Sequence, residues 1–90
     1  MGAAGQGGPS AEGAAMRDLV DYVARNVVDD PESVEVALHE RGHVVELRLK
    51  VDAEEMGKVI GRQGRVAKAL RGLLAAAATR SGKRVNLEIG

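Results

Sequence analysis

Two glycines that flank two polar residues, in Gly61-Arg62-Gln63-Gly64, form the part of the sequence best suited to bind a ligand. Glycine at both ends allows a sharp backbone turn and leaves no Cβ in the way of an approaching group. The residues after Gly64 have a helical pattern, and the first N–H groups of a helix lack partners within it and favour an anion. Arg62 can add several hydrogen bonds to phosphate oxygens. The pattern predicts a loop that binds the backbone phosphates of a nucleic acid.

Residues on both sides of this loop complete the predicted site. Basic side chains would extend the contact to neighbouring phosphates, and aliphatic side chains would form a shallow groove for bases beside the second strand. The alternative is an ordinary helix–turn–helix corner with solvated arginines, since glycine pairs at this spacing are common. The predicted binding residues are Lys58, Val59, Ile60, Gly61, Arg62, Gln63, Gly64, Arg65, Val66 and Lys68.

The charges are divided unevenly along the chain, although the net charge is zero. Residues 1–55 hold five basic and twelve acidic residues, whereas residues 56–90 hold eight basic residues and one acidic residue. A basic region around a glycine loop can attract a polyanion even when the whole chain is neutral. The alternative is that the two parts of the chain pair with each other inside the fold.

Patterns of apolar residues predict the elements that hold this loop. Apolar residues recur at three- and four-residue steps in the helical segments and at every second position in the strands. The expected order is α-β-β-α-α-β, an α+β fold in which a three-stranded sheet carries helices on one face. The helices are expected at residues 14–29, 52–60 and 65–80, and the strands at residues 34–39, 45–51 and 85–89.

Three local patterns add detail to this expectation. Residues 1–13 are rich in glycine and are expected to form a flexible tail, which leaves residues 14–90 as the folded domain. Asp52 and Glu55 have the spacing of a capping box at the start of the second helix. The residues of the third helix that are expected to face the core are Val66, Leu70, Leu73, Leu74 and Ala77.

Residue types and their spacing argue against an enzyme, a metal protein or a membrane protein. The chain has no cysteine, which removes disulfides, thiolate metal sites and cysteine nucleophiles. His39 and His43 bracket a predicted turn, whereas a metal site needs three or four convergent ligands. The glycine loop lacks the Lys-Ser/Thr of a nucleotide P-loop and no serine lies in a nucleophile elbow, so we expect no catalytic residue, metal or cofactor. With no run of about 18 apolar residues, no membrane insertion is expected, and the cytoplasm is the simplest location.

The segment of residues 55–71, EMGKVIGRQGRVAKALR, resembles the small bacterial single-KH proteins of the KhpA family. Residues 18–31 and 82–89 are similar to the same family, so the resemblance covers residues 15–90. It implies a type II, or prokaryotic, KH domain that binds single-stranded RNA through its GxxG loop. It also implies a cytoplasmic RNA chaperone or post-transcriptional regulator linked to cell elongation and division. The partners that it implies are a second copy of the chain, in a homodimer, and a larger KH protein of the Jag (KhpB) type.

The third predicted helix has a stripe of small residues beside its leucines. The stripe contains Ala69, Gly72, Ala75 and Ala76, and a glycine inside a helix costs about 1 kcal/mol relative to alanine. Small side chains allow another helix or strand to approach closely. Two interpretations follow: a homodimer packs through this helix, or Gly72 packs against the chain's own first helix or sheet.

Overall fold

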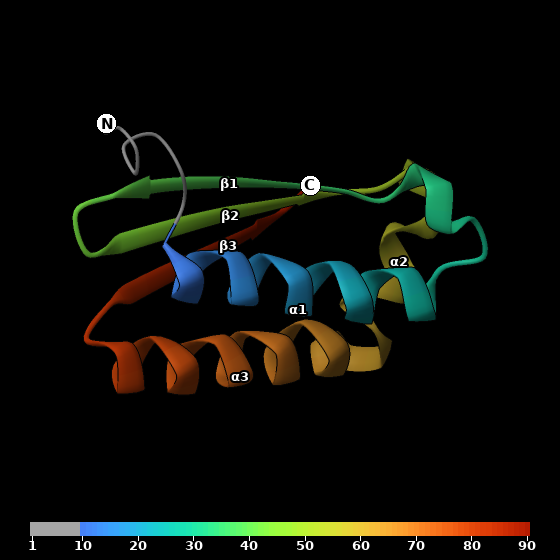
Figure 1. Ribbon diagram of the computed structural model, residues 1–90. Coiled ribbons are helices and arrows are strands. Elements are labelled where there is room, and N and C mark those ends of the chain that lie inside the picture. Colours follow the sequence, from blue (N-terminus) through green and yellow to red (C-terminus); the bar gives the residue numbers. More distant parts are fainter. Residues whose placement is uncertain (1–9) are drawn as a thin grey trace.

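The computed structural model describes residues 10–90, which form a three-stranded sheet with the helices gathered on one face (Figure 1). The elements are α1 (Ala11–Val27), β1 (Glu35–Arg41), β2 (Val44–Lys50), α2 (Met56–Ile60), α3 (Arg65–Ser81) and β3 (Arg84–Ile89). Single 3-10 turns at Pro31–Ser33, Ala53–Glu55 and Arg62–Gly64 lie between them. The order and the layers confirm the predicted α+β fold. None of the helices within the described residues is long and apolar enough to cross a membrane.

β2 is the central strand of the sheet, and its two neighbours pair with it in opposite ways. β1 and β2 form an antiparallel hairpin, in which Glu35 lies opposite Lys50. β3 runs parallel to β2, with Val44 opposite Arg84. Parallel neighbours need a long crossover connection, and α2 and α3 supply it. The glycine loop therefore lies inside this crossover, between its two helices.

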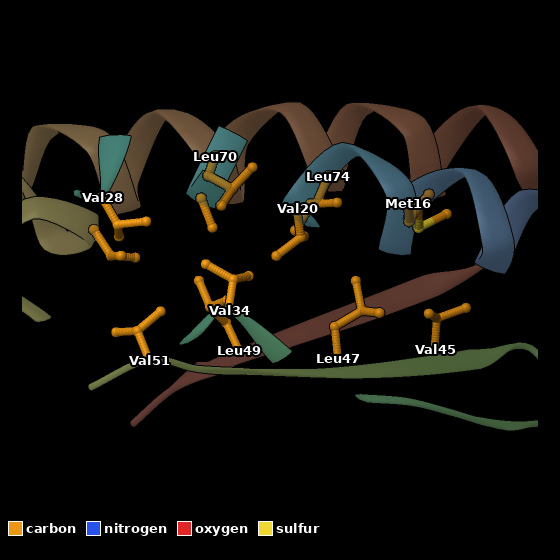
Figure 2. Packing of buried hydrophobic residues seen from close by; sticks show 13 residues of the cluster. Met16, Val20, Val28, Val34, Val45, Leu47, Leu49, Val51, Leu70 and Leu74 are labelled. Carbon is orange, nitrogen blue, oxygen red and sulfur yellow. The ribbon is translucent and has the colours of Figure 1, made fainter. Parts of the chain in front are cut away.

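The core lies between the inner face of the sheet and the helices α1 and α3 (Figure 2). Alternate residues of β2 point towards the helices, as predicted from their period of two, and Leu47 and Leu49 are at most 2% exposed. Leu70 and Leu74 of α3 face them in the close view, beside Val20 of α1. This core fixes α3, and with it the start of α3, against the sheet.

The first helix begins earlier than expected, at Ala11 instead of residue 14. Ser10 is its N-cap residue, and its hydroxyl accepts the N–H of Gly13 at 3.0 Å. Gly13 is buried, and a Cβ there would lie 2.7 Å from a carboxylate oxygen of Glu40. The predicted boundary after residue 13 is therefore corrected, because residues 10–13 belong to the folded unit. The rest of the predicted tail lies outside the described residues.

The predicted buried face of α3 is confirmed except at one residue. Leu70 and Leu74 are buried and Val66 and Ala77 are partly buried, but Leu73 is 55% exposed. The buried residues of the helix are Ala67, Leu70, Leu74 and Ala78. The core face of the helix therefore consists of two leucines with one alanine at each end, and Ala69, Ala75 and Ala76 are exposed. Leu73 therefore remains on the surface beside the stripe of small residues.

Gly72 itself lies on the exposed side of α3. A Cβ built at this position would meet no atom within 4 Å. The chain's own α1 and sheet therefore do not require a glycine there, which removes one of the two interpretations of this residue.

Candidate nucleic-acid interface

The Gly61-Arg62-Gln63-Gly64 loop joins the end of α2 to the start of α3 (Figure 1). The N–H of Gly61 donates to the carbonyl oxygen of Gly57 at 2.8 Å and ends α2. The N–H of Gly64 donates to the carbonyl oxygen of Gly61 at 3.0 Å and closes one tight turn. Gly61, Gln63 and Gly64 have positive φ angles of 82°, 58° and 74°. Residues with a side chain rarely adopt such φ angles, and glycine occupies two of these three positions.

Gly61 is required by packing as well as by its backbone angles. Its φ of 82° and ψ of 169° lie in a region that is essentially restricted to glycine. A Cβ there would lie 2.5 Å from Cγ2 and 2.8 Å from the backbone nitrogen of Val66. At Gly64, by contrast, a Cβ would meet nothing within 4 Å. Gly61 is therefore a close-packed position, whereas Gly64 leaves the start of α3 open to an approaching group.

The start of α3 is suited to a negatively charged group. Gly64 is its N-cap residue, and no side chain caps the first turn. Arg62, Arg65 and Lys68 are exposed and form no ion pair within residues 10–90. The helix dipole, the N–H groups of the first turn and these cations all attract phosphate.

The three aliphatic residues among the predicted binding residues, Val59, Ile60 and Val66, differ in how far they are exposed. Val59 is only 1% exposed and belongs to the core, so its predicted place in the lining of the groove is corrected. Val66 is partly buried and packs against Gly61, where it supports the loop. Ile60 is 38% exposed and remains available for contact with a base.

Lys58 is held by two carboxylates of its own chain. Its ammonium group donates to Oδ2 of Asp29 at 2.5 Å and to Oε1 of Glu55 at 3.3 Å. The hydrogen bond to Asp29 is the main reason why the pKa of Lys58 is raised above its ordinary value. A phosphate group would have to compete with these carboxylates for the ammonium group.

Glu55 has a different role from the one that its spacing suggested. The predicted capping box does not form, because Asp52 makes no side-chain cap. The carboxylate of Glu55 instead accepts the N–H of Asp29 at Oε1, at 3.0 Å, and the N–H of Asp30 at Oε2, at 2.7 Å. The bond from Asp29 is the main cause that lowers the pKa of Glu55, against the opposing effect of burial. Glu55 therefore connects the start of α2 to the segment that follows α1.

Glu40 makes a similar connection at the other end of α1. It accepts the N–H and the hydroxyl of Ser10 at 2.9 and 2.7 Å and the ammonium group of Lys83 at 3.0 Å. These bonds, the one from the Ser10 N–H first, lower the pKa of Glu40 to about 2. Sequence periodicity missed both glutamates, because their partners are distant in sequence. The available signal for Glu40 was its place on the inward side of β1, in step with Val36 and Leu38.

Most basic residues of the second part of the chain have no carboxylate partner. Only Lys58 and Lys83 of that part pair with acidic residues of the first part within the described residues. Six others form no ion pair there: Arg62, Arg65, Lys68, Arg71, Arg80 and Arg84. The two parts therefore neutralise each other only in part through ion pairs, and Arg62, Arg65 and Lys68 keep positive charge at the glycine loop and the start of α3.

A shallow groove lies between α3 and the free edge of β3. The residues that line it are Arg71, Leu74, Ala75, Val85, Asn86 and Leu87. The guanidinium group of Arg71 donates to the carbonyl oxygen of Leu87 at 3.3 Å across this groove. β2 is flanked on both sides by β1 and β3 and has no free edge, and the groove for bases beside the second strand stays a prediction.

The two histidines do not converge on a ligand. His39 lies on β1 opposite Glu46, and His43 lies in the turn before β2. Within residues 10–90, no group of three or more His, Cys, Asp or Glu side chains is placed to hold a metal ion.

Together, the α-β-β-α-α-β order, the mixed sheet and a Gly-x-x-Gly loop between two crossover helices define a KH domain. The family of KhpA and KhpB KH domains matches residues 17–89, and the chain belongs to this family. This membership confirms the family suggested by residues 55–71 and the expectation that the chain is not an enzyme.

Curated relatives and solved structures are similar to the chain. It is 49% identical over 74 residues to the RNA-binding protein KhpA of Halalkalibacterium halodurans, covering 82% of this chain and 97% of that protein. It is 47% identical over 75 residues to the RNA-binding protein KhpA of Aquifex aeolicus, covering 83% and 95%. A crystal structure of Era in complex with MgGDPNP and nucleotides 1506–1542 of 16S ribosomal RNA has a TM-score of 0.57 and 21% identity. That match covers 82% of this chain and 28% of the Era chain, and it shows the fold alone.

Proposed function

We propose that this chain binds single-stranded RNA by holding the backbone of about four nucleotides at its GxxG loop. The observation that carries the proposal is the uncapped start of α3 beside an open Gly64, surrounded by cations without carboxylate partners. The names of the KhpA relatives, which are RNA-binding proteins, support the same class of ligand. Arg62, Arg65 and Lys68 would contact phosphates and so contribute affinity for any sequence.

The groove between α3 and β3 would receive the bases in this proposal. Its lining is aliphatic apart from Arg71 and Asn86, and it contains no aromatic side chain on which a base could stack. The only aromatic residue, Tyr22, lies on α1. We therefore expect weak binding with broad sequence preference from a single domain.

The double substitution Arg62→Asp with Gln63→Asp tests the proposal. Both side chains are exposed, so the fold should persist while two new carboxylates repel the phosphates. The control is Arg17→Asp with Asn26→Asp, which changes the net charge by the same amount on α1 instead of in the loop. Binding of a labelled single-stranded RNA should be lost in the first variant and kept in the second, with circular dichroism reporting the fold. Retained affinity in the folded loop variant would refute the loop as the binding site.

We also propose that the exposed side of α3 forms a homodimer. Leu73 is 55% exposed beside Gly72, and Gly72 has no packing role within the described residues of its own chain. Leu73 would supply an apolar contact to a second helix, and Gly72 beside it, which has no side chain, would let that helix approach closely. A helix-interior glycine that costs about 1 kcal/mol is then explained by the partner it admits.

A pair of substitutions at Gly72 tests the dimer. Gly72→Leu should produce a monomer because the new side chain fills the space of the partner helix. Gly72→Ala, the control, should remain dimeric and gain about 1 kcal/mol of helix stability. Sedimentation measures the oligomeric state of both variants, and circular dichroism reports whether they are folded. A wild-type chain that is monomeric at tens of micromolar would refute the dimer, and a folded, dimeric Gly72→Leu variant would refute this surface.

The family resemblance extends the proposal to a role in the cell. It favours an RNA chaperone or post-transcriptional regulator in the cytoplasm, linked to cell elongation and division. A larger KH protein of the Jag (KhpB) type would then use the same α3 surface as the second copy. Co-purification of such a protein with the wild-type chain, but not with Gly72→Leu, is the result expected.

A further inference from the structure

The glycine loop follows the end of α2, and this helix is too short to keep a fixed orientation without tertiary contacts. It has five residues, whereas isolated helices shorter than about 12 residues are marginal in water. Val59 is its one buried residue, and Met56 is partly buried against the core. Other tertiary contacts must therefore hold the helix, and with it the loop, in one orientation.

Glu55 supplies such contacts at the opposite end of α2 from the loop. It is the N-cap residue of the helix and is 6% exposed. Each of its carboxylate oxygens accepts one backbone N–H, from Asp29 and from Asp30, so two bonds fix both the position and the plane of the group. Lys58, one turn along the helix, bonds to the same carboxylate and to Asp29.

We propose that Glu55 is a positioning residue for the GxxG loop: by binding Asp29 and Asp30, it holds α2 so that the loop presents the open side of Gly64 to the ligand. The inference rests on the proposed function for its effect on RNA affinity. Gly61 follows Glu55 by six positions, which corresponds to roughly 9 Å of helix. A small tilt at Glu55 would therefore displace the loop relative to α3.

This role changes the interpretation of Lys58. As part of the same cluster, its ammonium group is a bridge between α2 and the segment after α1, and its effect on RNA binding is through loop geometry. Asp29 then has two functions, since its N–H binds Glu55 and its carboxylate binds Lys58.

Glu40 provides a matched control for Glu55. Both glutamates accept a backbone N–H from a residue that borders α1, and both pair with a lysine. They lie at opposite ends of α1, whose 17 residues span roughly 25 Å. Loss of either carboxylate should lower the free energy of unfolding, whereas only loss of the Glu55 carboxylate should change the orientation of the GxxG loop.

The experiment compares Glu55→Gln with Glu40→Gln in the full chain. Glutamine keeps the size and one acceptor oxygen, but its NH2 group then faces the second N–H. Glu55→Gln should shift the amide NMR signals of Gly61 and Gly64 without RNA, and weaken RNA binding about five- to tenfold well below the unfolding temperature. Glu40→Gln should leave those signals in place and the affinity within about twofold. A folded Glu55→Gln chain with unchanged loop signals and affinity would overturn the inference.

A measurement on the wild-type chain does not depend on whether the variant folds. If the Glu55 bonds favour the loop conformation that binds RNA, RNA must favour those bonds by the same factor. Hydrogen exchange at the amides of Asp29 and Asp30 should therefore slow when a single-stranded RNA is added. RNA that binds at the loop without slowing this exchange would overturn the inference. If RNA does not bind at the loop, the proposed function fails, while the shift of the loop signals in Glu55→Gln still tests the positioning.

Discussion

Replacing the two loop glycines by alanine, one at a time, should separate packing from ligand access. Gly61→Ala places a Cβ 2.8 Å from a backbone nitrogen of Val66, and a backbone atom cannot escape by changing rotamer. The same change forces alanine into a glycine-only backbone region, at a cost of about 1–3 kcal/mol before the overlap is counted. We expect a loss of about 3 kcal/mol, which for a domain of this size lowers the unfolding temperature by roughly 12–24 °C.

Gly64→Ala should cost much less, because its Cβ would meet no atom within 4 Å. Alanine in the left-handed region costs about 1–2 kcal/mol, partly offset by a less flexible unfolded chain, so a net loss of about 1 kcal/mol is expected. RNA affinity should still fall, because the new methyl group occupies the open approach to α3. Gly57→Ala is the control: this helical glycine is exposed, has no positive φ, and should gain about 1 kcal/mol.

Urea unfolding of the three variants, with RNA binding measured on each folded protein, gives the comparison. The expected order of stability is Gly57→Ala, wild type, Gly64→Ala, Gly61→Ala. Equal stability of the two loop variants would refute the close contact between Gly61 and Val66. Wild-type RNA affinity in Gly64→Ala would refute the open face at Gly64 as the place where the backbone binds.

Two further predictions concern charge. Lys68→Ala should weaken binding to all RNA sequences by a similar factor and reduce the salt slope by roughly 0.7, whereas a change confined to one sequence would show that Lys68 contacts bases. The pKa of Glu40 is lowered from 4.5 to about 2, so its ionised form adds stability that is complete above pH 4.5 and is lost as the pH falls towards 2. Thermal unfolding of Glu40→Gln should show a loss of about 1–3 kcal/mol at pH 7 that disappears near pH 2, and a pH-independent difference would contradict the bonds to Ser10 and Lys83.

The sequence predicted the parts of the fold that depend on local periodicity. The alternation in β2 identified Val45, Leu47 and Leu49 as core residues because a strand repeats every two residues. The face of α3 was predicted except at Leu73, because only packing against the sheet selects which of two adjacent leucines is buried. The glycine loop was located because both of its glycines have positive φ angles, which restrict the residue type.

The polar contacts around the site could not be predicted in the same way. Glu55 has the spacing of a local cap, but its partners at residues 29 and 30 are brought close only by the tertiary fold. Ser10 was placed in a tail because residues 1–13 are rich in glycine, yet its bonds to Glu40 join it to the sheet. Local sequence patterns cannot predict such bonds between distant residues, although these bonds help to determine where helices begin and end.

The net charge of the chain is zero, so its electrostatic attraction for RNA depends on where the charges lie. With no net charge, long-range attraction depends on the separation of charge. Seven basic residues form no ion pair within residues 10–90, and all of them except Lys50 on β2 lie on the loop, α3 or the start of β3. The salt dependence of binding follows the number of phosphates contacted, whatever the net charge of the protein. On α1, Asp18 and Asp21 pair with Arg17 and Arg25, so this helix offers RNA little attraction, and a neutral chain of this kind can still favour the approach of its ligand to the loop and α3.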